Sequence, residues 1–131
     1  MYQVSHFSET RLAVQHALIQ AQPLGMLICN DERHRPMANS VPFLLDRDKG
    51  TLGTLQAHVA RANPQWQQLQ RAASCLVVFQ GEDGYISPNW YPSKALHGKV
   101  VPTWNYITVH AWGTPQVIDD PDWLRYQFGE M

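Results

Sequence analysis

The sequence predicts one mainly β domain, a small barrel of short strands with a few helices around it. The 131 residues (15.0 kDa) are enough for one compact domain. Hydrophobic residues make up 44% of the chain and charged residues 16%, which is typical of a folded globule. Short β-prone segments dominate and do not alternate with helices, so a parallel α/β sheet is excluded and a barrel is favoured.

The first expected element is a helix over residues 11–22, which contain no Gly or Pro and are rich in Ala, Leu and Gln. Leu12 and other apolar residues recur there at helical spacing. Ser8 or Thr10 is the expected N-cap, and Pro23 is expected to end the helix.

Short strands are expected next. Residues 24–29 form an apolar run, the polar NDERHRP stretch (30–36) predicts a loop, and residues 37–45 predict a returning strand. The DRDKGT segment predicts a turn that ends at Gly50. Residues 51–57 predict a short strand or the entry to a helix.

A second helix is expected to begin near Asn63, with Pro64 in its first turn, where the missing N–H costs nothing. The strongest local signal follows at residues 76–87 (LVVFQGEDGYIS). An apolar run, a Gly-Glu-Asp-Gly segment and a second β-prone run predict a hairpin there. The Pro-, Trp- and Tyr-rich stretch after it predicts a loop.

Residues 103–112 alternate strictly and predict a strand with Trp104 and Tyr106 on one face and Asn105 and Ile107 on the other. The tail predicts a capped helix that begins at Asp120 or Asp122. No repeat, low-complexity tract or internal linker interrupts the chain, so we expect residues 1–131 to form a single domain.

The charge balance and the cysteines exclude several classes of protein. Ten Lys plus Arg against eleven Asp plus Glu give a formal charge of -1, which leaves no basic surplus for strong non-specific nucleic-acid binding. Cys29 and Cys75 lie in apolar segments without CxxC spacing, which predicts reduced thiols. No segment resembles a signal peptide or approaches the roughly 20 apolar residues of a membrane span. We therefore expect a cytoplasmic protein.

Aromatic and short polar side chains are crowded together between residues 85 and 112. The aromatic members are Tyr85, Trp90, Tyr91, Trp104, Tyr106 and Trp112, and the polar ones include Ser87, Asn89, Ser93, Lys94, Thr103 and Asn105. This mixture suits a flat, heteroatom-rich ligand such as a flavin, a haem or a nucleobase. The alternative, which composition alone favours, is that the rings pack a barrel or a dimer interface.

A second candidate feature is the pair His58 and Arg61 in the segment HVARANPQW. In a turn that leads into a helix, Arg61 could bind a phosphate through two hydrogen bonds, assisted by backbone N–H groups. The alternative is that Arg61 is a surface residue or pairs with a local acid.

The sequence shows no catalytic signature. It lacks the GxSxG elbow, the Walker loop, GxGxxG after a strand and HExxH. The six histidines are scattered without metal-ligand spacing, so we predict no metal site. Asp119, Asp120 and Asp122 are typical of a helix start. Any redox chemistry would therefore belong to a bound cofactor, which leaves a flavin-dependent oxidoreductase activity as an open expectation.

Taken as whole blocks, these segments resemble the PaiB family of FMN-binding negative transcriptional regulators. The resemblance is carried by HVARANPQW (58–66), VVFQGEDGYISPNWYPSK (77–94), KVVPTWNYITVHAWG (99–113), the opening MYQVSHF and ANSVPFLLD (38–46). It runs from Met1 to about Asp122. It implies a split β-barrel of the flavin-reductase and pyridoxamine-phosphate-oxidase type with flanking helices, a homodimer, and FMN bound at the subunit interface.

The resemblance also implies residues for the flavin site. His58 and Arg61 match basic residues that hold the flavin phosphate. The residues expected to border the isoalloxazine or the partner subunit are Ser87, Trp90 and Tyr91. Those expected to donate to ring or phosphate oxygens are Thr103, Trp104 and Asn105. Lys94 and Lys99 are weaker candidates for the phosphate.

The chain departs from the family pattern in two places. Ser40 stands where the family has a histidine, so an imidazole that could stack or hydrogen-bond there is absent. Family chains also continue well past the Asp-Pro-Asp-Trp helix start, whereas this sequence ends at Met131. We expect either a fragment or a naturally shortened copy.

Two other functions stay open at this stage. The first is a flavin-free regulator that affects transcription indirectly, because no helix-turn-helix pattern and no basic surplus support direct operator binding. The second, ranked last, is a haem-handling split barrel with His58 or His110 as the iron ligand. Flavin absorbance bands, a Soret band or a colourless protein would distinguish the three.

Overall fold

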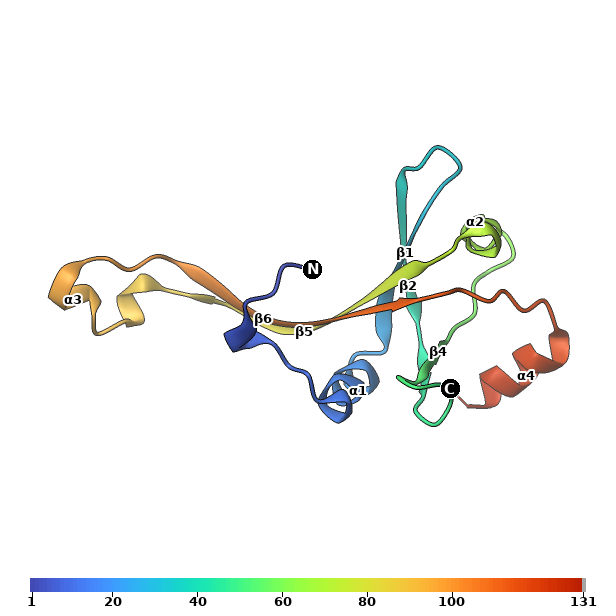
Figure 1. Cartoon of the computed structure of the whole chain (residues 1–131), viewed down its shortest axis with the longest axis horizontal. Coiled ribbons are helices and arrows are strands. Elements are labelled where there is room, and N and C mark those ends of the chain that lie inside the picture. Colours follow the sequence, from blue (N-terminus) through green and yellow to red (C-terminus); the bar gives the residue numbers. More distant parts are fainter. Residues whose placement is uncertain (131) are drawn as a thin grey trace.

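The computed structural model describes residues 1–130. Its centre is a four-stranded antiparallel sheet in the order β2-β1-β5-β6, and β3 and β4 form a second, two-stranded sheet (Figure 1). The strands are β1 (Leu24–Asn30), β2 (Pro36–Pro42), β3 (Leu44–Asp46), β4 (Thr54–Gln56), β5 (Cys75–Ile86) and β6 (Thr103–Gly113). The predicted mainly β class with flanking helices is confirmed.

Four α-helices and two 3-10 turns flank the sheets within the described residues. They are η1 (Ser5–Phe7), α1 (Leu12–Ala21), α2 (Gln65–Arg71), η2 (Pro88–Trp90), α3 (Lys94–His97) and α4 (Pro121–Gly129). Among residues 1–130, no helix has both the length and the apolar character needed to cross a membrane.

The predicted helix caps are correct for α4 and wrong for α1. The Asp120 carboxylate accepts a hydrogen bond from the Asp122 N–H (2.8 Å) at the start of α4. At α1 the N-cap residue is Arg11, which makes no side-chain capping bond. The Glu9 carboxylate instead accepts hydrogen bonds from the Arg11 backbone N–H (2.8 Å) and guanidinium, and so fixes the cap residue itself without capping the first turn.

The predicted hairpin over residues 76–87 is wrong, because β5 is one strand from Cys75 to Ile86. It pairs with β6 before and after Gly81 and Glu82, with Gln80 opposite Thr108 and Asp83 opposite Tyr106. The register shift between these two pairs is a β-bulge, which accommodates one extra residue in β5 and bends the strand. The turn-like residues therefore bend a strand instead of reversing it.

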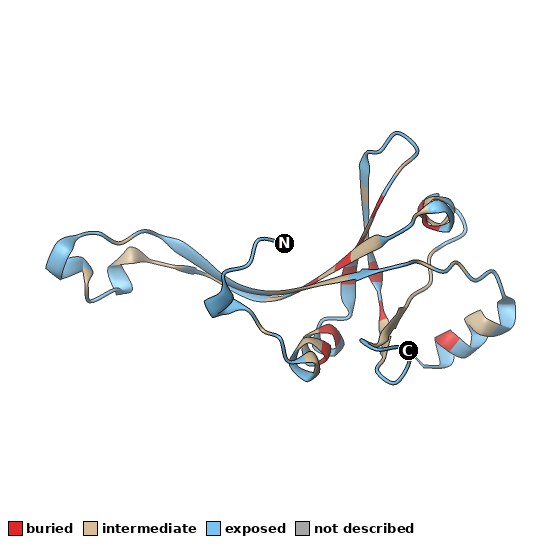
Figure 2. Cartoon of the chain, in the orientation of Figure 1, coloured by how far each residue is buried: buried red, intermediate tan, exposed pale blue. Residues whose placement is uncertain are grey.

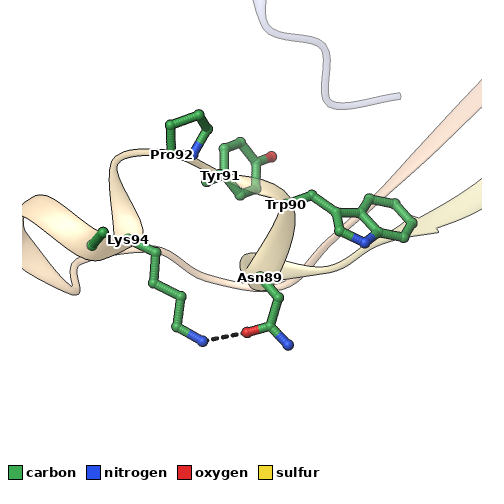
Figure 3. A pocket seen from close by; sticks show the side chains of 6 residues that line it. Asn89, Trp90, Tyr91, Pro92 and Lys94 are labelled. Atoms are coloured by element: carbon green, nitrogen blue, oxygen red, sulfur yellow. Dashed lines mark hydrogen bonds between the residues drawn. The ribbon is translucent and has the colours of Figure 1, made fainter.

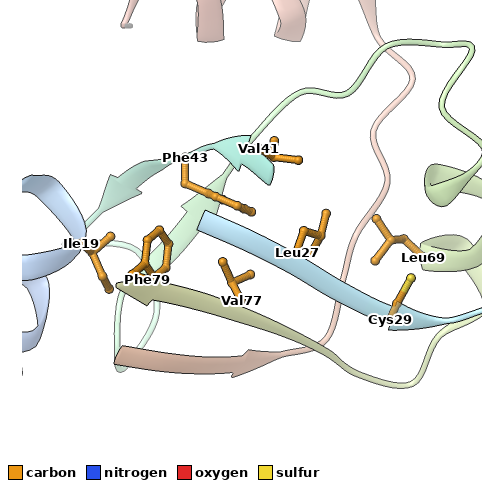
Figure 4. Packing of buried hydrophobic residues seen from close by; sticks show 8 residues of the cluster. All are labelled: Ile19, Leu27, Cys29, Val41, Phe43, Leu69, Val77 and Phe79. Carbon is orange, nitrogen blue, oxygen red and sulfur yellow. The ribbon is translucent and has the colours of Figure 1, made fainter. Parts of the chain in front are cut away.

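The hydrophobic core lies between the four-stranded sheet, α1 and α2, as the buried residues in Figure 2 show. Its members, drawn in Figure 4, are Ile19, Leu27, Cys29, Val41, Phe43, Leu69, Val77 and Phe79. Phe79 is fully buried and meets the Phe43 ring edge to face at 5.7 Å between centroids. A Cβ on Gly25 would lie 2.7 Å from Val77 Cγ1, so only glycine lets the strand pack this closely.

Beyond the bulge, β5 and β6 leave the body of the molecule as a two-stranded ribbon. We call residues 81–107 the arm; η2 and α3 lie at its tip, far from α2 and α4 (Figure 1). Its large exposed side chains are Tyr85, Trp90, Tyr91, Leu96, Val101, Trp104, Tyr106 and Ile107. An isolated two-stranded ribbon is marginally stable in water, and contiguous exposed apolar side chains of this kind are typical of interaction surfaces.

Both cysteines are free thiols, as predicted. Leu27 pairs with Val77 and Ile28 with Leu76, so the same register sets Cys29 opposite Cys75. Burial, and then the neighbouring Cys29, raise the pKa of the Cys75 thiol.

We therefore predict that iodoacetamide modifies Cys75 more slowly in the folded protein than in the urea-unfolded chain at neutral pH. Only the thiolate reacts, and a raised pKa lowers its fraction until the pH passes the folded-state value. The folded and unfolded rates should converge as the pH rises. The measurement is mass spectrometry of the alkylated Cys29→Ser variant, in which Cys75 is the remaining thiol, and equal rates at neutral pH would contradict the prediction.

Candidate functional site

The His58–Arg61 segment lies between β4 and α2 and is fixed by local hydrogen bonds. The Asn63 N–H donates to the Ala60 carbonyl (2.9 Å), and the Asn63 side-chain oxygen accepts from the Gln65 N–H (3.0 Å) at the start of α2. The Trp66 indole N–H donates to the Arg61 carbonyl (3.1 Å). Hydrogen bonds between Asn63 and Gln65 and between Trp66 and Arg61 thus hold the loop against the start of α2.

The Arg61 guanidinium lies over the Trp66 ring, 5.3 Å from the ring centroid, and donates to the carboxylate of Asp119. Asp119 directly precedes the cap residue of α4. The hydrogen bond and the charge of Arg61 lower the pKa of Asp119, and the same contact raises the pKa of Arg61. Arg61 therefore pairs with an acid, as one of the sequence-based alternatives allowed, but that acid is Asp119, 58 positions away, and not a neighbour in the sequence.

His58 is held by the other end of α4. Its Nδ1 lies 2.8 Å from Gln127 Oε1, and its ring meets Phe128 edge to face at 4.5 Å between centroids. Gln127 is fully buried, and within the described residues its Nε2 has no hydrogen-bond partner. A buried donor without a partner is costly, so an acceptor atom placed beside it would be stabilised.

At the tip of the arm, Ser87 caps the short η2 turn by accepting a hydrogen bond from the Asn89 N–H (3.2 Å). Lys94 Nζ donates to the Asn89 side-chain oxygen, as Figure 3 shows, while the Trp90 indole points away from this bond. A shallow open hollow at the tip is lined by Asn89, Trp90, Tyr91, Pro92, Lys94 and Ala95. The exposed rings of Trp90 and Tyr91 are therefore available for contact with a ligand or another surface at the tip of the arm.

Thr103, Trp104 and Asn105 open β6 and are all exposed. The Trp104 indole N–H donates to the Asp83 carboxylate across the ribbon (2.9 Å), and its ring lies 6.0 Å from the Tyr85 ring. The indole is thus oriented by Asp83, and Trp104 remains 54% exposed.

The structure brings the eight predicted site residues together in two groups. His58 and Arg61 lie beside α2 and α4, whereas Ser87, Trp90, Tyr91, Thr103, Trp104 and Asn105 lie on the arm, at the other end of the molecule (Figure 1). One chain therefore does not assemble these residues into a single cradle. The first group offers cationic N–H donors that suit an anion, and the second offers aromatic faces that suit a planar ring system.

Sequence reasoning missed the neighbours of the two basic residues, namely Asp119, Gln127 and Phe128. These lie 58 or more positions away along the chain, and no local pattern connects them. Ser40, at the place of the family histidine, lies in β2 opposite Met26 of β1 and is exposed.

Comparison with known proteins identifies the family. A family model described as "Putative FMN-binding domain" matches residues 1–131. Over 95% of its length the chain is 37% identical to the uncharacterized protein YKL070W of Saccharomyces cerevisiae, of which it covers 83%. It is 30% identical over 91% of its length to the Protease synthase and sporulation protein PAI 2 of Bacillus subtilis, of which it covers 54%.

An uncharacterized protein of Aspergillus fumigatus is 33% identical over 92% of this chain, which covers 58% of it. The chain thus spans little more than half of the bacterial and Aspergillus relatives and most of the yeast one. The predicted PaiB resemblance is confirmed, the mainly β architecture agrees with a split-barrel-like fold, and the family match supports FMN as the cofactor. The chain belongs to this FMN-binding domain family.

Proposed function

We propose that this protein is a homodimer that binds FMN between the basic residues of one copy and the aromatic arm of the other. The observation that carries the proposal is the separation of the site residues into two groups at opposite ends of the molecule. A second copy can supply the missing group to each site. A two-fold pair would make two equivalent sites, because its interface repeats the same contacts on both subunits.

The basic group would hold the phosphate. Arg61 uses one nitrogen for Asp119, which leaves further N–H donors on an exposed side chain. Its position over Trp66 restricts the side chain before any ligand binds. Bound FMN supplies the redox chemistry, and we assign no catalytic residue of this chain to it.

The arm would hold the ring system and the partner. Trp90 is 67% exposed, Trp104 54% and Ile107 59%, so the arm presents a large apolar area to solvent. Burying that area is the main source of binding energy between proteins. The partner we infer is a second copy, because the body of this chain carries the groups that complete the flavin site.

The proposal includes an indirect regulatory role in the cytoplasm. The Bacillus subtilis relative is named a protease synthase and sporulation protein. The formal charge of -1 offers no basic surplus for operator DNA, so an effect on transcription would pass through a partner or through the flavin.

The first test is titration of the purified protein with FMN, followed by flavin fluorescence. We expect saturation at one FMN per chain and a Kd that rises about 10- to 100-fold in Arg61→Ala, because a hydrogen bond to a charged group is worth about 1.5–3 kcal/mol. Arg71→Ala is the matched control, since Arg71 is exposed to a similar degree and pairs with Glu32 instead. Its Kd should equal that of the wild type.

Each alternative has its own outcome in this experiment. A protein that takes up no FMN would favour the hypothesis of a flavin-free regulator. A Soret band after haem addition would favour the hypothesis of a haem-handling split barrel. An Arg61→Ala variant with unchanged FMN affinity would remove Arg61 from the phosphate site.

A further inference from the structure

Both predicted phosphate-binding residues contact the same C-terminal element. Asp119, just before α4, accepts from Arg61, and Gln127 and Phe128, at the end of α4, contact His58. The Arg61 guanidinium, which we propose binds the flavin phosphate, therefore already contacts an anionic group of the same chain, the Asp119 carboxylate.

Arg61 is otherwise arranged to receive an anion. Its carbonyl is tied to the Trp66 indole, its guanidinium lies over the same ring, and its side chain is 66% exposed. A guanidinium has five N–H donors, and Asp119 occupies one edge of it. A phosphate that approached the remaining edge would lie within a few ångströms of the Asp119 carboxylate.

We propose that Asp119 determines the affinity and selectivity of the phosphate subsite, because its carboxylate competes with the flavin phosphate for Arg61. The inference rests on the proposed function, since it concerns the same site. Its consequence is a smaller preference for FMN over riboflavin, which lacks the phosphate, than Arg61 alone would give.

The charges favour competition. Arg61 lowers the pKa of Asp119, so the carboxylate stays ionised at neutral pH. A phosphate monoester carries about -1.5 to -2 charges at pH 7. Two anions on one guanidinium repel each other. When the phosphate binds, the Asp119 carboxylate therefore either leaves Arg61 or stays and weakens phosphate binding by repulsion.

The test compares FMN and riboflavin binding in the wild type and in Asp119→Asn. We expect FMN to bind about two- to fivefold more tightly to the variant, in line with the modest strength of an exposed ion pair, and riboflavin affinity to stay the same. Asp122→Asn is the matched control, because Asp122 lies three residues further along in the first turn of α4, is exposed, and pairs with Arg125. Its affinities for both flavins should match the wild type.

A double variant separates competition from a general charge effect. In the Arg61→Ala background, Asp119→Asn should leave the FMN Kd nearly unchanged, because the shared guanidinium is gone. Weaker FMN binding by Asp119→Asn would overturn the inference, because it would show that the carboxylate orients Arg61 for the phosphate. Equal FMN affinity in wild type and Asp119→Asn would overturn this inference alone, whereas a wild type that binds neither flavin would overturn the proposed function as well.

Discussion

Phe79→Ala is expected to lower the free energy of unfolding by about 3–5 kcal/mol, the usual cost of removing a buried phenylalanine ring. Phe79 is 0% exposed, packs edge to face on Phe43, and lies in the centre of the sheet beside Gly25. Domains of this size are stable by only about 5–15 kcal/mol, so the variant would lose a large share of its stability. Urea unfolding followed by far-UV circular dichroism measures the loss.

The matched control is Phe7→Ala. Phe7 is 80% exposed in the η1 turn, so its removal should change the free energy of unfolding by less than about 0.5 kcal/mol. Similar losses in the two variants would contradict the placement of the core.

Ile107→Glu is expected to convert the proposed dimer into a monomer and to abolish FMN binding at micromolar concentrations. In a single chain Ile107 is 59% exposed, so a carboxylate there costs little. Buried in an interface without a partner, the same charge would cost about 3 kcal/mol or more, which raises the dimer Kd by about 100-fold or more. The FMN site would be lost with the dimer, because neither copy holds both halves.

Sedimentation velocity measures the change as a fall from twice the chain mass to the chain mass of 15.0 kDa. Leu52→Glu is the control, since Leu52 is 71% exposed in the turn before β4 and outside the arm. It should remain dimeric and bind FMN. A wild type that sediments as a monomer when saturated with FMN would contradict the dimer itself.

Much of the body could be predicted from local sequence. The helix over residues 11–22 became α1, the strand over 24–29 became β1, and the helix near Asn63 became α2. The signals were helical spacing of apolar residues for the first helix, an apolar run for the strand, and Pro64 in the first turn for the second helix, and each is contained within a few neighbouring residues.

The hairpin wrongly predicted over residues 76–87 shows what local sequence patterns cannot determine. A glycine-bounded acidic segment between two β-prone runs has the composition of a hairpin turn, and a bulge within one strand has the same composition. The pairing with β6 decides between them, and its partner residues lie from 17 positions away (Ile86 with Thr103) to 36 positions away (Leu76 with Trp112). The alternation over 103–112 likewise predicted two faces without predicting that both would be exposed along the arm.

The sequence predicted which types of side chain form the candidate site, but it did not predict how these side chains are placed in space. The types of side chain that FMN needs are present in the blocks that resemble the family. That His58 and Arg61 lie far from Trp104 follows from the length of the ribbon, which depends on how β5 and β6 pair (Figure 1). The contact of Asp119 with Arg61 depends on where α4 returns, and no segment of sequence encodes that position by itself.

The position of β6 at the end of the sheet order has a consequence for handling this protein. The outer side of β6 is an open edge, and its eleven residues, TWNYITVHAWG, include no Lys, Arg, Asp, Glu or Pro. Natural edge strands usually carry such residues as protection against sheet-to-sheet aggregation. Until another surface covers it, this strand is the segment most prone to aggregation, so refolding yields should fall as the chain concentration rises.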